Sequence, residues 1–420
     1  MAVCYRCAAA ADEDAMMAVL SLAFRREAGG EKFERDRAAF RRDPERFRVL
    51  EAEGRIVGAL HIGRHRIQVG RGVVTKADVG EVAILPTYQG KGYGSRLMSE
   101  TVAWMREAGF HLSRLGGYAA FYRRFGWAPF PRGFVEFPLS GLRSRGGFTD
   151  PEVMLKPGAC PGRIRPYDPA TDFEAHTRLY CAFNRNRTGA RPHEASRPPA
   201  PDANWKPNPW RVVYEEAGDV LAFLFAAASG EDHTRFETRV SFQDGGVSPG
   251  SPEALGYLIR HHLLAAHRFG ATCVSARLPL DPALYPVYRD YSLGFTPTLW
   301  QTTESSNMLQ VIDFPGLVDA LLPELQARLR DAVIPIREGG LCLEVNGQTV
   351  ALCVRDGVLT QEPGDMSTVE LDQDLFCLLL LGLLPVAHAV RRLPVCPPRD
   401  QVALLDALFP PQGTATGVWG

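Results

Sequence analysis

The alternation of apolar and polar residues over the first third of the chain predicts an α/β unit with a central mixed sheet. Short β-rich runs alternate with stretches in which apolar residues recur every three or four positions, the spacing of a helix with one buried face. The dipeptide Gly54-Arg55 lies between two β-rich runs and predicts a hairpin turn. In order, the pattern predicts a helix over residues 13–26, strands over 47–53, 56–62, 66–76 and 79–85, a helix over 95–108 and a strand over 110–113.

Part of this pattern occurs a second time. The segment FYRRFGWAP at 121–129 has a counterpart in VYRDYSLGFTP at 287–297. Before each segment comes a predicted helix that ends at a glycine, Gly109 or Gly270. A short β-rich run lies between that glycine and the segment. The sequence therefore predicts a duplicated fold.

Two further stretches differ from these copies in composition and in their pattern of apolar residues. Residues 188–209 are rich in proline, which excludes a helix or a central strand and leaves a surface loop, a flap or a disordered insert. From about residue 306 the chain predicts a smaller α+β unit. Its signals are two β-rich runs joined by Asn346-Gly347, a strong hairpin turn, then one buried helix over the apolar run 375–387 and a last helix over 401–409.

The segment AILPTYQGKGYGSRLM, residues 83–98, joins a predicted strand to a predicted helix through a loop with three glycines. Such a junction predicts an anion site, because free N–H groups of the first helical turn point into the loop and the helix dipole adds positive charge. The loop is not a P-loop, since Lys91 is followed by glycine, and not a dinucleotide fingerprint, since Ser95 stands where the third glycine belongs. The second copy reads FQDGGVSPGSPEAL here and lacks the glycine spacing.

Composition narrows the class of protein. The 420 residues carry a formal net charge of −1. The protein as a whole therefore lacks the excess positive charge that would attract nucleic acid or an anionic membrane. The nine cysteines are irregularly spaced, which favours reduced thiols in the cytoplasm over a disulfide framework. Cys4-x-x-Cys7 has no second ligand pair, and His261 and His262 are adjacent on a helix and diverge. We therefore expect no metal site.

The spacing Gln89-x-x-Gly92-x-Gly94, the FYRRFGWAP segment and the closing LLDALFP resemble the Eis-like (enhanced intracellular survival) branch of the GNAT acetyltransferase superfamily. The resemblance extends over essentially the whole chain. It implies a catalytic GNAT domain at residues 1–148, a degenerate second GNAT-like domain at 149–305 and a sterol-carrier-protein-like domain at 306–420. It further implies a cytoplasmic homo-oligomer, a hexamer in that branch, which transfers an acetyl group from acetyl-CoA to a primary amine.

Carried onto this chain, the resemblance implies a site for acetyl-CoA and a general acid. Tyr122 matches the tyrosine that protonates the coenzyme A sulfur. A phenol suits that task, because its pKa of about 10 is close to that of the thiol it forms. The strand edge at Val82, Ala83 and Ile84 would pair with the pantetheine amides. The pyrophosphate would be held by Gln89, Gly90, Lys91, Gly92, Tyr93, Gly94 and Ser95.

The base that accepts the amine proton is open at this stage. The resemblance implies the terminal carboxylate, here that of Gly420, but this chain ends in glycine where the branch has an aromatic residue. Asp78 and Glu81, on the strand before the glycine loop, are the alternatives. The acceptor amine could be an aminoglycoside, a polyamine, a peptide or a lysine side chain. The competing functions are a non-catalytic acyl-CoA or lipid-binding scaffold and a protein-interaction module.

Overall fold

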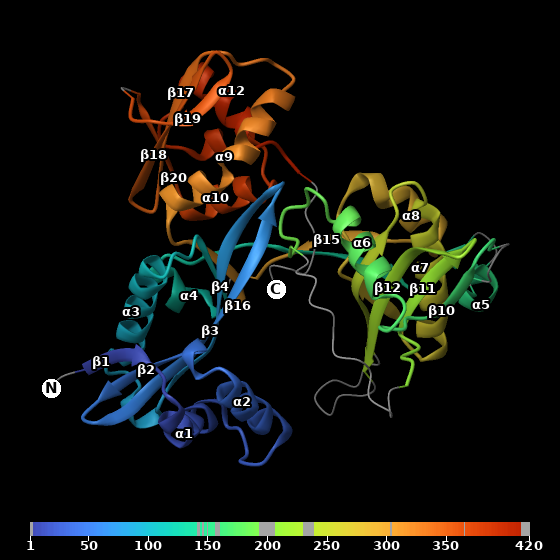
Figure 1. Cartoon of the computed structure of the whole chain (residues 1–420), viewed down its shortest axis with the longest axis horizontal. Helices are drawn as coiled ribbons and strands as arrows, with labels where there is room; N and C mark the ends of the chain where they lie inside the picture. Colours follow the sequence, from blue (N-terminus) through green and yellow to red (C-terminus); the bar gives the residue numbers. More distant parts are fainter. Residues whose placement is uncertain are drawn as a thin grey trace.

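The computed structural model describes residues 3–140, 143–144, 147–148, 150–155, 160–192, 206–229, 239–302, 305–364 and 366–412. They form two mixed seven-stranded sheets and a smaller four-stranded sheet with its own helices (Figure 1). The predicted fold class is therefore confirmed. Within these ranges no helix combines the length and the apolar character needed to cross a bilayer.

The first sheet has helices on both faces. Helices α1 and α2 pack on one face around Met16, Phe40 and Ala59. Helix α3 packs on the other face, around Leu97 and Leu60. The strands lie in the order β1 (Val3–Cys7), β2 (Phe47–Ala52), β3 (Arg55–Val69), β4 (Gly72–Ile84), β5 (Leu112–Tyr118), β16 (Ser305–Val311) and β6 (Ala128–Pro129). The helices are α1 (Glu13–Phe24), α2 (Glu31–Arg42), α3 (Tyr93–Glu107) and the short α4 (Ala119–Tyr122).

The second sheet repeats this topology. Helix α7 covers one face with Leu255 and Leu258, and α6 covers the other with Leu179. The order is β10 (Arg163–Pro166), β11 (Arg211–Glu216), β12 (Asp219–Ser229), β13 (Arg239–Val247), β14 (Cys273–Ala276), β7 (Arg132–Pro138) and β15 (Thr296–Trp300). The other elements are a two-stranded ribbon of β8 (Arg143–Ser144) and β9 (Gly147–Phe148), with α5 (Pro151–Met154), α6 (Phe173–Phe183), α7 (Pro252–Arg268) and α8 (Tyr285–Asp290).

The two large sheets exchange one strand each. Strand β7 follows β6 in the chain but enters the second sheet, between β14 and β15. Strand β16 follows β15 but enters the first sheet, between β5 and β6. The exchange is reciprocal and occurs at the same place in both sheets, so it supports the predicted duplication.

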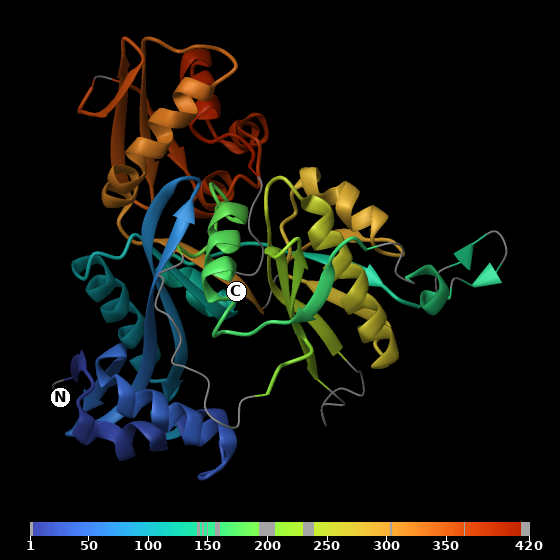
Figure 2. The ribbon, with the colours of Figure 1, turned by 45° about the vertical axis from the view of Figure 1, so that its right-hand side comes forward.

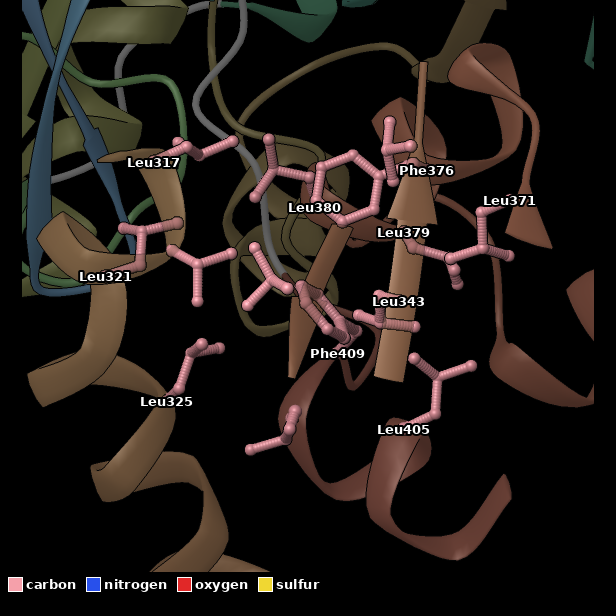
Figure 3. Close-up of a cluster of buried hydrophobic side chains, with 14 of the residues drawn as sticks. Leu317, Leu321, Leu325, Leu343, Leu371, Phe376, Leu379, Leu380, Leu405 and Phe409 are labelled. Carbon is pink, nitrogen blue, oxygen red and sulfur yellow. The ribbon is translucent and has the colours of Figure 1, made fainter. Parts of the chain in front are cut away.

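The third unit forms around an apolar core. Strands β17 (Gly339–Val345), β18 (Gln348–Arg355), β19 (Val358–Gln361) and β20 (Thr368–Leu371) lie in the order β19-β18-β17-β20. The helices are α9 (Phe314–Asp331), α10 (Gln373–Leu380), α11 (Val386–Ala389) and α12 (Arg399–Leu408). Their side chains meet in the cluster of Figure 3: Leu317, Leu321, Leu325, Leu343, Leu371, Phe376, Leu379, Leu380, Leu405 and Phe409.

The hairpin of β3 and β4 reaches from the first sheet to the third unit (Figures 1 and 2). At its tip, the Arg71 N–H donates to Glu324 Oε2 on α9 over 3.0 Å. The Gly70 N–H donates to Thr188 Oγ1, which in turn donates to Gln412 Oε1, both over 3.0 Å. The hairpin tip therefore contacts α9 and Thr188 directly, and it is joined to Gln412 through Thr188.

Some predicted elements need correction. The strand predicted over 66–76 is broken at Gly70, whose φ of +58° turns the chain, so its two halves belong to β3 and β4. The single helix predicted over 375–387 is two helices, because Gly382, with φ +68°, and Pro385 separate α10 from α11. The hairpin predicted at Asn346-Gly347 is confirmed, with φ values of +54° and +72°.

Candidate active site

The glycine loop leaves open space in front of α3. Gly92 is the N-cap of α3 with φ +86°, and Gly90 has φ +72°. A β-carbon on either glycine would meet no heavy atom within 4 Å. The first turn of α3 presents N–H groups that have no acceptor within the helix, and the helix dipole makes this end positive. The structure therefore has a glycine turn and open space in front of the N-terminus of α3.

Two polar side chains hold this loop to its surroundings. Gln89 Nε2 donates to the carbonyl oxygen of Ile84, the last residue of β4, over 3.0 Å. Lys91 Nζ donates to the carbonyl oxygen of Thr87 over 2.8 Å and lies 5.4 Å from the Tyr88 ring centroid. Gln89 thus bonds to the end of β4 and Lys91 to the loop, and both use carbonyl oxygens rather than the N–H groups of the helix start.

Strands β4 and β5 separate just before the loop. They pair in parallel only from Lys76↔Leu112 to Val79↔Leu115. Beyond that point β5 continues with β16 as its partner, whereas β4 carries a bulge in which Glu81 adopts φ +54°. After the bulge Ala83 and Ile84 pair with β3, and among the described residues none of Val82, Ala83 and Ile84 pairs with β5. The split leaves a strand edge to which an extended amide chain could bond.

Tyr122 lies beside this split. Its ring packs against the α-carbon of Gly117 on β5 and contacts the Phe121 ring edge-on, with centroids 5.0 Å apart. Phe121 in turn reaches Gly94 at the start of α3, where its Cζ lies 3.5 Å from the position of a β-carbon. Burial raises the pKa of Tyr122, so the phenol keeps its proton at neutral pH. Within the described ranges the Tyr122 hydroxyl makes no hydrogen bond.

The three candidate bases lie in different surroundings. Asp78 faces Lys76 Nζ at 2.9 Å and His65 Nε2 at 3.2 Å, one rung before the split. Glu81 forms ion pairs with Arg26 and with Lys32, the latter at 3.8 Å, on the side of α1 and α2. Asp78 thus lies one rung before the split, and Glu81 lies in the bulge two residues beyond the last rung. Gly420 lies outside the described residues.

Sequence reasoning missed two residues at the root of the split. His65 alternates with Gly63 and His61 on β3 and shares a face with Asp78, a signal visible in the run HIGRH. Burial lowers the pKa of His65, Asp78 opposes this shift, and Arg191 and Lys76 add to it. Arg114 of β5 lies opposite Asp78 in the sheet. No local motif marks it.

A family comparison covers the domain that contains all these features. Residues 4–130 match the family model described as "Acetyltransferase (GNAT) domain". A search of curated protein sequences found no match. The fold and this match define the chain as an acyltransferase with an N-terminal GNAT acetyltransferase domain.

Solved structures match the fold over nearly the whole chain. Eis1 from Mycobacterium abscessus is 17% identical with a TM-score of 0.59, and the match covers 100% of both chains. A GCN5-related N-acetyltransferase from Kribbella flavida is 20% identical with a TM-score of 0.64, covering 98% of this chain and 97% of that chain. A GCN5-related N-acetyltransferase from Anabaena variabilis is 15% identical with a TM-score of 0.63, covering 99% and 98%. At these identities the similarity establishes the arrangement of the fold.

Proposed function

We propose that the chain is an N-acetyltransferase that transfers the acetyl group of acetyl-CoA to a primary amine by direct attack. The observation that carries the proposal is the position of Tyr122, between the split of β4 and β5 and the start of α3. A pure binding protein needs the loop and the strand edge but has no use for a buried, protonated phenol at that point.

The residues of the loop and the strand edge fit acetyl-CoA. The N–H groups from Gly90 to Ser95, at the open start of α3, suit a pyrophosphate, whereas the Gln89 N–H already donates to the carbonyl oxygen of Pro86. The free edge at Val82, Ala83 and Ile84 suits the amides of a pantetheine arm. The bound cofactor supplies an activated thioester carbon. The contribution of the chain is mainly to hold that carbon and the amine in line.

Two proton transfers fall to side chains of the protein. As the N–C bond forms and the C–S bond breaks, Tyr122 gives its proton to the sulfur, and a base takes one proton from the amine. We propose the terminal carboxylate of Gly420 as this base. The alternatives from the described residues are Asp78, which faces Lys76 and His65, and Glu81, which faces Arg26 and Lys32.

We also propose the finer features that the resemblance implies. These are the domain limits 1–148, 149–305 and 306–420, except that β7 joins the second sheet and β16 joins the first. The other features are a sterol-carrier-like third domain, a cytoplasmic location and a hexameric assembly. The nine free cysteines agree with a reducing compartment. A second candidate function, a non-catalytic acyl-CoA or lipid-binding scaffold, is favoured only by the presence of the third unit.

Calorimetric titration with acetyl-CoA, followed by a free-thiol assay with a panel of amines, tests the proposal. We expect one acetyl-CoA per chain and amine-dependent release of thiol. Binding without turnover on any amine would favour the scaffold. Two equivalents per chain would show that the second copy also binds acetyl-CoA.

A further inference from the structure

The tip of the β3–β4 hairpin is joined to the C-terminal part of the chain by a first polar relay. The Gly70 N–H donates to Thr188 Oγ1, and the Thr188 hydroxyl donates to Gln412 Oε1, both over 3.0 Å. Thr188 is fully buried, so water cannot replace these two bonds. One hydroxyl group therefore connects the hairpin to Gln412, the last of the described residues.

A second relay starts one residue further along the hairpin tip. The Arg71 N–H donates to Glu324 Oε2 over 3.0 Å, and Arg328 Nε donates to Glu324 Oε1 over 2.8 Å. Arg328 Nη1 then donates to the carbonyl oxygen of Leu408, the last residue of α12, over 2.9 Å. Glu324 and Arg328 are both buried, so a desolvated ion pair links the hairpin to the end of α12.

This buried ion pair is better suited to fixing a position than to adding stability. Desolvation of the two charges offsets much of their attraction, and well-packed apolar side chains would join the same surfaces at least as tightly. An ion pair with a hydrogen bond at each end does, however, impose a defined register on the groups that it joins. Here those groups are the hairpin tip and the end of α12.

The two relays fix both ends of the segment 408–412. Within it, Phe409 packs in the apolar core of the third unit, and the Gln412 N–H donates to the carbonyl oxygen of Gly382 over 3.2 Å. The two residues between them are prolines, whose rings restrict the backbone. The point at which the chain leaves the third unit is therefore held beside the hairpin tip.

The length of chain after this point matches the length of the hairpin. Residues 413–420 lie outside the described structure, and eight residues span at most about 26–29 Å when fully extended. On β3, Val69 marks the tip of the hairpin and Gly63 the rung opposite Asp78, six residues and roughly 20 Å away. Gly420 can therefore reach the rung of Asp78 from the hairpin tip, with little length to spare.

The charges on that rung favour the arrival of a carboxylate. Asp78 lies opposite Arg114 of β5, and its carboxylate contacts Lys76 Nζ at 2.9 Å. Arg114 donates to the neutral side chain of Asn307 over 2.7 Å and forms no ion pair among the described residues. Two cationic side chains therefore stand against one carboxylate, and a second carboxylate would balance them.

We propose that Thr188, Glu324 and Arg328 are positioning residues. They hold the start of the segment 413–420 at the hairpin tip, so that its terminal carboxylate reaches the reacting end of the site. The inference rests on the proposed function, in which this carboxylate accepts the amine proton, and it names the residues that place it. Because the segment has little length to spare, loss of either relay withdraws the carboxylate and leaves the acetyl-CoA site as it is.

Thr188→Val tests the first relay, because it keeps the shape of the side chain and removes the hydroxyl. We expect kcat to fall roughly fivefold, the effect of one net hydrogen bond, with KM for acetyl-CoA unchanged. Thr188→Ser keeps the hydroxyl and should restore kcat. Thr360→Val is the control and should leave kcat unchanged, since it removes a hydroxyl that donates to the carbonyl oxygen of Cys353, within the third unit.

A double-mutant cycle separates positioning from a general loosening of the fold. In the chain that lacks residues 418–420, Thr188→Val should not lower kcat further, because the carboxylate that Thr188 places is already absent. Glu324→Gln, which removes the charge opposite Arg328, should behave in the same way, and its melting temperature shows whether the chain still folds. An equal loss of kcat from Thr188→Val in both backgrounds would overturn the inference.

Carboxypeptidase digestion tests the placement of the segment without any measurement of turnover. The enzyme removes residues from a free C-terminus, and mass spectrometry follows the loss of Gly420 and Trp419 with time. We expect release to be roughly fivefold faster in Thr188→Val than in the parent protein or in Thr360→Val. This result without turnover of any amine would overturn only the proposed function. Equal rates of release in the three proteins would overturn the inference.

Discussion

Gly117 lies so close to the ring of Tyr122 that a β-carbon at position 117 would come within 2.7 Å of Cε2. The φ of Gly117, +153°, also favours glycine. Gly117→Ala should therefore displace the Tyr122 ring and lower kcat at least tenfold, the scale of a misplaced catalytic group. Acetyl-CoA affinity, measured by calorimetry, should change little. Gly116→Ala is the control, because a β-carbon there would lie 3.9 Å from Asn307 Oδ1, its nearest neighbour outside the adjacent residues. Equal kcat in both variants would contradict the role of this contact.

Tyr122→Phe removes the proposed proton donor and keeps the ring with its contacts to Phe121 and Trp127. We expect kcat to fall roughly 10²-fold, within the range of a positioned general acid, with little change in acetyl-CoA affinity. Steady-state kinetics with saturating acetyl-CoA measure this. A variant as active as the parent protein would leave Tyr122 as a packing residue.

Gly92→Asp places a side chain and a negative charge in the open space before α3, at a backbone φ of +86°. Acetyl-CoA binding should be lost in calorimetry while the chain stays folded. Gly54→Asp introduces the same residue at φ +70° in the turn between β2 and β3, and it controls for backbone strain. Normal binding by the Gly92 variant would show that the pyrophosphate lies elsewhere.

Removal of Val418–Gly420 tests the proposed base. If the terminal carboxylate accepts the amine proton, the shortened chain should lose at least tenfold in kcat, the lower range of a general base. Its melting temperature and acetyl-CoA binding should be unchanged. Extension of the chain by a C-terminal tag should act in the same way. Full activity of both variants would return the role to Asp78 or Glu81, and Asp78→Asn and Glu81→Gln would then be the next variants to measure.

His262 makes the folded protein sensitive to acid. Its side chain is fully buried on α7, with Nε2 3.1 Å from the carbonyl oxygen of Leu224, and burial lowers its pKa to about 4. The unfolded chain takes up this proton below about pH 6.5, whereas the folded chain resists until about pH 4. The stabilisation is therefore complete above pH 6.5 and is lost as pH falls, by about 3 kcal/mol in total.

His262→Phe should flatten this pH dependence of the urea midpoint between pH 6.5 and 4. The exposed His388→Gln is the control. Some slope should remain in the His262 variant, because burial also lowers the pKa of His61, His65 and His111. A slope equal to that of the parent protein would contradict the assignment.

The sequence predicts those features that depend on neighbouring residues. The glycine loop, the Asn346-Gly347 hairpin and the duplicated segments are local patterns, and the structure contains all three. The break of the predicted strand at Gly70 is not visible in the sequence, because residues that favour β-strands stand on both sides of the turn. The position of Arg114 opposite Asp78 could not be predicted, since the two residues lie on β5 and β4 and meet only in the sheet. Which sheet a strand joins is likewise a long-range property.

The exchange of β7 and β16 also affects how the protein is made. The first sheet lacks the neighbour of β5 until residues 305–311 have left the ribosome, although all its other strands come from the first 129 residues. Until then the edge of β5 is an unpaired template that can join another chain. A fragment that ends at residue 148 keeps this edge permanently and leaves β7 without its sheet. The acetyltransferase domain is therefore complete only after the second sheet has been synthesised.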